Sequence, residues 1–276
     1  MPPTESVADK RRAFKRLHEA GCFVIPNPWD LGSALWLQQM GFAALATTSS
    51  GFAWSQARPD NGITLEMALA HLAQMVAGTR VPVNADFEGG FAAEPEGVER
   101  HVALAVATGV AGLSIEDSTG RAGQPLYALD QAVARIRAAR RAIDAAGGDT
   151  LLVGRAECFL VGRPDMDETI ARLKAYADAG ADCLYAPGIR TPERIAAVVQ
   201  AVAPKPVNVL LGAASDLPVA EVARLGVRRI SVGGALARAA WGGFLRAARG
   251  LAEGRFDGFA DAASGADLNR AFTAPQ

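Results

Sequence analysis

Eight short apolar runs, rich in Val, Ile and Leu, alternate with longer segments of helical periodicity, and this alternation constrains the fold more than any other feature of the chain. The runs span residues 22–27, 43–49, 81–87, 112–117, 151–157, 183–188, 205–211 and 228–234. The helical segments span residues 30–40, 64–79, 95–108, 130–145, 166–179, 191–201, 217–225 and 235–252. Eight strand-then-helix units predict an α/β fold, a (β/α)8 barrel of the TIM type. A doubly wound open sheet shows the same alternation and is the alternative.

Residues with helix-capping chemistry mark several of these boundaries. Asp30 and Thr64 stand where N-caps are expected. Pro192 follows Thr191 and takes the first position of its helix, where the missing amide hydrogen costs nothing. These signals support the predicted helix starts.

The composition fits one large globular unit. Half of the 276 residues are hydrophobic, so a sizeable core can form without disulfides. We predict a single barrel domain over residues 1–276, with a short helical extension over about residues 253–276.

Charge and hydropathy argue against two classes of partner. Lys and Arg number 28 against 29 Asp and Glu, and no basic block stands out, so nucleic acid is not expected. No stretch reaches the roughly 20 apolar residues of a membrane span, and the N-terminus has no apolar signal core. Cys22, Cys158 and Cys183 are far apart and form no CxxC motif, which predicts buried thiols in a reducing, cytoplasmic compartment.

Polar side chains gather where the predicted strands end, which is the face of such barrels that carries chemistry. They include Ser50, Asn84, Asp86, Glu88, Glu116, Asp117, Arg155, Glu157, Asn208 and Ser231. Asp86, Glu116 and Arg155 follow apolar neighbours, so we expect them to face the barrel interior. Ionised groups at that depth must be paired or coordinated. Either an acidic metal site with an arginine facing it or a structural Asp/Glu–Arg network meets that demand.

A metal at this place would have oxygen ligands only. His18, His71 and His101 fall in helical or linking segments, and we expect them to be surface or packing residues. Mg²⁺ fits best, because it keeps several waters and needs one or two carboxylates. Mn²⁺ accepts the same ligands.

Two glycine-containing segments could hold an anion. The amides around Ser50-Gly51-Phe52 could cradle a carboxylate or an oxyanion, although Ser-Gly is also a common turn. Gly233 opens a helix after the last strand, where many barrels bind phosphate or carboxylate. A packing role for this glycine is the alternative.

Taken in order along the chain, five segments resemble the isocitrate lyase/phosphoenolpyruvate mutase superfamily. They are "NPWDLGSALWLQQMGFAALATTSSGF", "VPVNADFEGGF", "GVAGLSIED", "RAECFLVGRPDMDETIARLKAYADAGAD" and "GVRRISVGGALARAA". The resemblance implies that Asp86 and Glu116 belong to a Mg²⁺ site, directly or through water, and that Asp60 lies near the metal waters. Asn84 occupies the first acidic position of the family's Asp-Ala-Asp segment, where it can coordinate or accept from a metal-bound water but adds no charge.

The resemblance also implies a substrate site and an assembly. Ser50, Gly51 and Phe52 match the segment that binds the substrate's carboxylate and enolate oxygen, and Arg155 matches the arginine that contacts the carboxylate. We add Asn208 and Gly233, from other strand ends, to the substrate site. The family further implies that the last helix is exchanged between subunits, usually in a dimer of dimers.

The loop after the fourth strand departs from the family's lyases. Isocitrate and methylisocitrate lyases carry a Lys-Lys/Arg-Cys-Gly-His segment there, whereas residues 116–130 read "EDSTGRAGQPLYALD" and contain no Cys, His or Lys. The mutase's Lys- and Asn-bearing gating loop is absent too, and Thr48 stands where the mutase has Trp. Arg121 could reach a distal carboxylate or phosphonyl group, or be solvated.

These observations lead to three functional hypotheses. The first is a Mg²⁺-dependent lyase that acts on a 2-oxo or 2-hydroxy carboxylic acid through an enolate, by C–C cleavage or decarboxylation, with Ser50, Glu116 and Arg155 as catalytic residues. The second is P–C chemistry, as a phosphonomutase or phosphonopyruvate hydrolase. The third is a protein that binds a 2-oxo acid or dicarboxylate with little turnover. No general acid is assigned.

Overall fold

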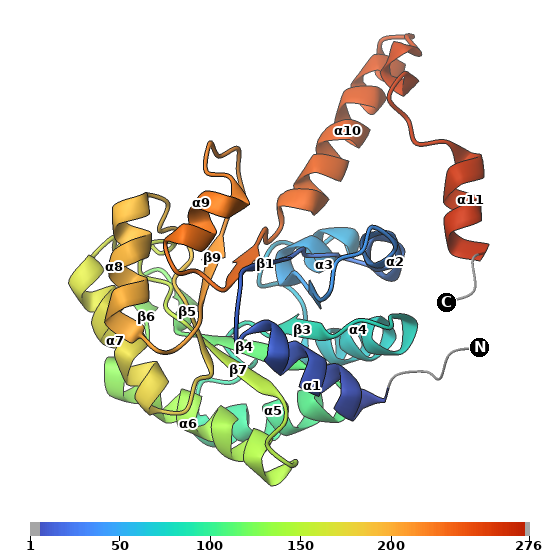
Figure 1. The fold of residues 1–276 in the computed structure, drawn as a ribbon. Helices are drawn as coiled ribbons and strands as arrows, with labels where there is room; N and C mark the ends of the chain where they lie inside the picture. Colours follow the sequence, from blue (N-terminus) through green and yellow to red (C-terminus); the bar gives the residue numbers. More distant parts are fainter. Residues whose placement is uncertain (1–5, 274–276) are drawn as a thin grey trace.

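Eight parallel strands form one curled sheet in the computed structural model, which describes residues 6–273 (Figure 1). The strands are β1 (Phe23–Ile25), β2 (Leu45–Ala46), β3 (Val83–Asp86), β4 (Gly112–Glu116), β7 (Leu151–Arg155), β8 (Cys183–Tyr185), β9 (Val207–Leu210) and β10 (Arg229–Ser231). Their order across the sheet is β2-β3-β4-β7-β8-β9-β10-β1. The predicted (β/α)8 barrel is confirmed, and the open-sheet alternative is wrong.

The barrel closes between β1 and β2 through hydrogen bonds at the carboxyl ends of these two strands. The Ala46 amide donates to the Pro26 carbonyl at 3.0 Å. The Asn27 side-chain amide donates to the Thr47 carbonyl at 2.9 Å. These two bonds satisfy polar groups that a sheet edge would leave open.

Helices on the outside of the barrel follow the strands in the predicted alternation. They are α2 (Leu31–Gln39), α4 (Leu65–Gly78), α5 (Pro95–Ala107), α6 (Leu129–Ala145), α7 (Met166–Asp178), α8 (Pro192–Val202), α9 (Val219–Arg224) and α10 (Ala235–Ala252). The side chains of Asp30, Thr64 and Thr191 each accept a hydrogen bond from the amide three residues later, as N-caps do. No helix within residues 6–273 is both long and apolar enough to cross a membrane.

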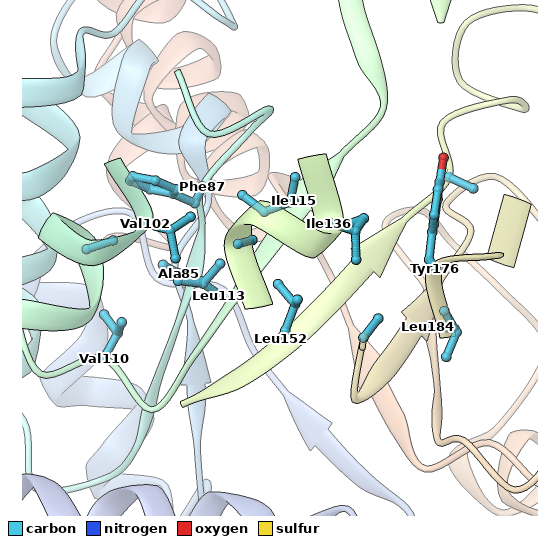
Figure 2. Packing of buried hydrophobic residues seen from close by; sticks show 14 of the residues in the cluster. Ala85, Phe87, Val102, Val110, Leu113, Ile115, Ile136, Leu152, Tyr176 and Leu184 are labelled. Atoms are coloured by element: carbon cyan, nitrogen blue, oxygen red, sulfur yellow. The ribbon is translucent and has the colours of Figure 1, made fainter. Parts of the chain in front are cut away.

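Side chains alternate between the two faces of each strand, and this sorts them by polarity. Phe87, Leu113 and Ile115 point outward and pack with helical side chains such as Val102 and Ile136 (Figure 2). The alternate positions point into the barrel, and on β3 and β4 they carry Asn84, Asp86, Ser114 and Glu116, with Gly112 opposite Asn84 at the start of β4. The period of two therefore builds an apolar outer core and a polar interior from the same strands.

A helix that the sequence did not reveal closes the barrel at the amino ends of the strands. Phe14 of α1 (Val7–Leu17) is fully buried there. It packs in a cluster inside the barrel with Ile25, Ala44, Ala111, Leu151, Val153 and Cys183. The cavity above this cluster is thus closed from below.

The carboxyl-terminal segment leaves the barrel. Helix α10 projects away from the strands, and α11 (Gly265–Thr273) returns beside α2 (Figure 1). The Gln39 side chain fixes this return by donating to the Ala271 carbonyl at 2.6 Å. Trp241, Phe244 and Leu245 on α10 are exposed by 41%, 59% and 42%. Exchange of this helix between subunits stays a prediction.

Candidate active site

The carboxyl ends of the strands surround a cavity of about 460 Å³. Its lining includes most of the predicted site residues: Ser50, Asp60, Asn84, Asp86, Glu116, Arg155, Asn208 and Gly233, together with Glu88. Gly51 and Phe52 lie outside the lining, where Phe52 stacks on His71 with ring centroids 4.0 Å apart. The structure thus brings together residues that are up to 183 positions apart in the chain, from Ser50 to Gly233 (233 − 50).

Arg155 lies at the centre of the charged residues. Its Nη1 is 3.1 Å from Asp86 Oδ1 and 3.0 Å from Glu116 Oε2, and its Nε donates to Glu157. Burial alone would lower the pKa of Arg155, but Glu116, Glu157 and Asp86 together raise it well above the usual range. Glu157 was predicted among the polar residues at the strand ends but was given no role in the site, although its position two after Arg155 places it on the same side of the chain.

Carboxylates outnumber cations in the cavity. Burial raises the pKa of Glu116 well above its usual range, and Arg155 offsets this only in part. Burial, and then the charges of Asp86 and Asp60, raise the pKa of Glu88 to about 8. Burial and the nearby Asp86 also raise the pKa of Asp60. A cation beside these groups would relieve their mutual repulsion.

Asp86 joins the arginine to the start of a helix. Its Oδ2 accepts from both the amide and the hydroxyl of Ser49, each at 2.9 Å. Ser49 opens α3 (Ser49–Ser55), a short helix that the sequence did not predict and whose N-cap is Thr48. A carboxylate is favoured at this position because helix amides point toward it. Asp86 is therefore held on both oxygens, by Arg155 and by Ser49.

The residues present fit a Mg²⁺ ion that keeps most of its waters. Within residues 6–273, no three His, Cys, Asp or Glu side chains are arranged to hold a metal by themselves. Glu88 nevertheless has a buried Oε1 without a hydrogen-bond partner, and its backbone adopts a left-handed φ of 48°. An orphaned carboxylate oxygen beside Asp86 and Asp60 suits a metal bound through one or two carboxylates and water.

Asn84 has a different neighbour from the one expected. Its Oδ1 accepts from Arg229 Nη1 at 3.4 Å. Arg229 Nε also donates to Asn208 Oδ1 at 2.9 Å, and Asn208 Nδ2 donates to Ser231 Oγ at 2.9 Å. These four residues, Asn84, Asn208, Arg229 and Ser231, form the deep part of the lining, which we call the cavity floor. The amide that occupies the family's first acidic position is thus held against a guanidinium.

Two helices begin at the cavity, and most of their first amides are already engaged. The Gly51 amide donates to Thr48 Oγ1 at 3.3 Å and the Phe52 amide to the Thr48 carbonyl at 3.0 Å. No acceptor within the described residues takes the Ser50 amide. At the start of α10, the Gly233 amide donates to Asn27 Oδ1 at 2.9 Å. The Ser50 amide is therefore available to a ligand, as is the amide of Gly234, which also lines the cavity and donates to no described residue.

The family model for phosphoenolpyruvate phosphomutase matches residues 14–252. The chain belongs to the phosphoenolpyruvate mutase/isocitrate lyase superfamily. A Mycobacterium tuberculosis protein without a described activity is 32% identical over 88% of this chain and 90% of its own length. Oxaloacetate decarboxylase of a Bradyrhizobium species is 29% identical, over 62% of this chain and 58% of its own.

Solved structures of superfamily members share the whole fold. A Burkholderia cenocepacia protein, whose name leaves open whether it is a lyase or a mutase, is 50% identical, with a TM-score of 0.95 and 98% of both chains covered. Oxaloacetate acetylhydrolase, solved with its product oxalate, is 26% identical with a TM-score of 0.85, over 96% of this chain and 94% of its own. Phosphonopyruvate hydrolase, solved with oxalate and Mg²⁺, is 25% identical with a TM-score of 0.84, over 95% and 94%.

The segment after β4 is the one whose composition departs from the family's lyase loop. It folds into a hairpin of β5 (Ser118–Arg121) and β6 (Gln124–Leu126). Arg121 is exposed at its tip and is absent from the cavity lining. The hairpin thus places no Cys, His or Lys over the cavity.

Glu116 and Asp117 are adjacent in sequence but serve different places. Glu116 faces the cavity, whereas Asp117 Oδ2 accepts from Arg172 Nη1 at 3.1 Å and from the Tyr176 hydroxyl at 2.5 Å. Asp117 Oδ1 also accepts from the Glu157 amide at 2.8 Å. Asp117 therefore supports the wall behind the site.

Proposed function

We propose that this protein is a Mg²⁺-dependent lyase that acts on a 2-oxo or 2-hydroxy carboxylic acid through an enolate, by C–C cleavage or decarboxylation. The observation that carries the proposal is the position of Asp86. This one carboxylate contacts Arg155, lies beside Asp60 and Glu88, and accepts from the first residue of α3. Carboxylates that could hold a cation, an arginine and a helix amide therefore meet in one cavity.

Each of these groups has a role in the proposed reaction. Asp86, with Asp60 and Glu88 through waters, would hold Mg²⁺, which stabilises negative charge on the enolate oxygen when bound. Asn84 is left out of this set because its carbonyl oxygen faces Arg229. Glu116 holds Arg155 in place from the adjacent strand.

Arg155 and Ser50 would bind the substrate. Arg155 uses Nε and Nη1 for its carboxylate partners, and its Nη2 donates to no described residue. That nitrogen is available for a substrate carboxylate, as charge-assisted hydrogen bonds of this kind are strong. The Ser50 amide is available for the enolate oxygen, and a fixed donor of this kind lowers the barrier because it needs no reorganisation.

The relatives support the substrate class. Their names include oxaloacetate and phosphonopyruvate, both 2-oxo acids, and two were solved with oxalate. P–C chemistry is the second candidate, because the matching family model is that of a phosphomutase. A binding protein with little turnover is the third, since the hairpin offers no acid for proton transfer.

The test is a panel of 2-oxo and 2-hydroxy acids, including oxaloacetate, assayed with and without Mg²⁺ for release of pyruvate, oxalate or CO₂. Phosphonopyruvate is assayed in parallel by phosphorus NMR. We expect metal-dependent turnover of a carboxylic acid, its loss in Asp86→Ala, and its retention in Arg121→Gln. Full turnover by Asp86→Ala would contradict the assignment of Asp86 to the metal site. Turnover of phosphonopyruvate alone would favour P–C chemistry.

We also propose a dimer of dimers in the cytoplasm, with α10 exchanged between subunits. Exposed Trp241, Phe244 and Leu245 on a projecting helix support the exchange, and three unpaired cysteines support a reducing compartment. Light scattering should give the tetramer mass, and Phe244→Glu should lower it. A monomer in solution at micromolar concentration would contradict this assembly.

A further inference from the structure

We propose that the cavity floor is a binding subsite for the second carboxylate of a dicarboxylate ligand, and that Arg229 is its anion-binding group. This inference rests on the proposed function, because it names the class of ligand for the same cavity.

Arg229 is a buried cation without a counter-ion. It is 3% exposed, and no Asp or Glu of the described residues forms an ion pair with it. Its partners are Asn208 Oδ1 at 2.9 Å, Asn84 Oδ1 at 3.4 Å and His18 Nε2 at 3.5 Å. All three partners are neutral, since the His18 Nδ1 donates to the Phe14 carbonyl at 2.8 Å and leaves Nε2 as an acceptor.

Arg135, which is 1% exposed, also lacks a carboxylate partner, but its Nη1 and Nη2 donate to the carbonyls of Gly89, Ala92 and Ala93. Two other buried arginines are paired with carboxylates. Arg155 contacts three carboxylates, and Arg172 contacts Asp117 and Glu168. Burying a guanidinium without such a partner is costly, because water no longer solvates the charge. Arg229 Nη2 donates to no described residue, and the side chain lines the cavity. An anion that enters the cavity would therefore find a strong and unused donor at its floor.

The backbone places Arg229 in line with Arg155. Arg155 pairs in register with Tyr185, Tyr185 with Asn208, and Asn208 with Arg229, so these side chains form one inward row across β7 to β10. The two guanidiniums are thus separated along the row by Tyr185 and Asn208 only. One carboxylate of the ligand would bind Arg155 Nη2, and the other would bind Arg229 Nη2 at the cavity floor.

Binding of a matched ligand pair tests the subsite. Succinate and butyrate differ mainly in one carboxylate, and their affinities are measured by calorimetry at fixed Mg²⁺. We expect Arg229→Gln to weaken succinate about tenfold or more, as the loss of a hydrogen bond to a charged group does, and to change butyrate by less than about threefold. Arg228→Gln is the control, since the neighbouring arginine bonds the Gly21 carbonyl at the surface.

A second variant keeps the test valid if Arg229→Gln does not fold. Asn84→Asp places a carboxylate beside the guanidinium and supplies the missing counter-ion from within the protein. It should be at least as stable as the wild type and should also lose the preference for succinate. An unchanged ratio of succinate to butyrate affinity in both variants would disprove the subsite.

Turnover assays, run beside these binding measurements, separate the subsite from the lyase assignment. If succinate preference depends on Arg229 while no oxo acid is turned over, the lyase assignment fails and the subsite stands. If oxaloacetate is cleaved and its selectivity over 2-oxobutyrate is the same in Arg229→Gln, the subsite fails and the lyase assignment stands.

Discussion

Arg155 and Glu116 are register partners on β7 and β4, and their side chains form an ion pair at 3.0 Å inside the barrel. Their contact is therefore set by strand pairing and does not depend on a loop. Asp86 reaches the same Arg155 nitrogen from β3, the next strand along. Charged groups placed on strands in this way keep their geometry better than groups on loops.

Removing the arginine should destabilise the fold as well as the site. Arg155→Met leaves Asp86, Glu116 and Glu157 buried without a cation, which should cost about 3–5 kcal/mol of unfolding free energy. Urea denaturation measures this loss. Arg155→Lys should recover only part of it, because an ammonium cannot reproduce the planar contacts. Arg121→Gln is the control and should stay within about 0.5 kcal/mol of wild type. Equal losses of unfolding free energy in Arg155→Met and Arg121→Gln would refute the pairing of Arg155 with the carboxylates.

Metal binding should depend on Asp86. In thermal denaturation, we expect Mg²⁺ to raise the Tm of the wild type, because a ligand that binds only the folded state stabilises it. Asp86→Asn should require at least about tenfold more Mg²⁺ for the same rise. Glu99→Gln, which breaks a surface ion pair with Arg141, is the control. An identical Mg²⁺ response in Asp86→Asn would place the metal elsewhere.

Adjacent Glu116 and Asp117 should give opposite results. Asp117→Asn disrupts a buried network with Arg172 and Tyr176, so unfolding free energy should fall by about 3 kcal/mol while Mg²⁺ affinity stays unchanged. Glu116→Gln should abolish turnover and cost roughly 1 kcal/mol, since Arg155 keeps two other carboxylates. Equal loss of turnover at unchanged stability in both variants would contradict the placement of Glu116 in the site and of Asp117 in the supporting network.

Buried His18 should make the protein sensitive to mild acid. Burial, and then the charge of Arg229, lower its pKa from 6.5 to about 3. Below pH 6.5 the unfolded chain therefore binds a proton that the folded chain does not, and stability falls as the pH drops. The slope from this group is up to about 1.4 kcal/mol per pH unit.

His18→Gln removes this contribution. Between pH 7 and pH 5, its unfolding free energy should fall by about 2 kcal/mol less than that of the wild type. Other titrating groups, such as His71 with a pKa lowered to about 4 by burial, are common to both proteins. Parallel pH profiles would show that His18 is not a neutral buried group.

The cavity floor should not tolerate a side chain at position 112. A Cβ on Gly112 would lie 2.7 Å from both Asn84 Oδ1 and Phe14 Cε1. Gly112→Ala should therefore cost about 1–3 kcal/mol through overpacking and should weaken dicarboxylate binding. Gly123→Ala, with no atom within 4 Å of its Cβ, is the matched control. Equal stability of the two alanine variants would contradict the close packing of Gly112 against Asn84 and Phe14.

The sequence predicted all eight barrel strands because their apolar runs and intervening helices have distinct periods. It missed α1 because this helix is mostly charged and deeply buries little besides Phe14, with its start fixed by a capping box of Ser6 and Asp9. It missed α3 because "SSGFAWS" has the composition of a turn. The β5–β6 hairpin is largely exposed, so no apolar alternation marks it.

The site was predictable where a single strand decides which way a side chain points. Asp86, Glu116 and Arg155 met this condition, and the structure brings them within one ion-pair cluster. Arg229 was not predictable in this way. Its importance depends on the lack of a carboxylate around it, and no local sequence pattern indicates that. Its contact with Asn84 spans 145 positions of the chain.

Helix α1 has a kinetic consequence. Because Phe14 and its neighbours plug the amino end of the barrel, the contents of the cavity can exchange only at the carboxyl ends of the strands. When a bound acid is split in such a dead-end chamber, the fragment nearer the mouth must depart before the deeper one can follow. Release of the two products should therefore be ordered, with the fragment held by Arg229 leaving last.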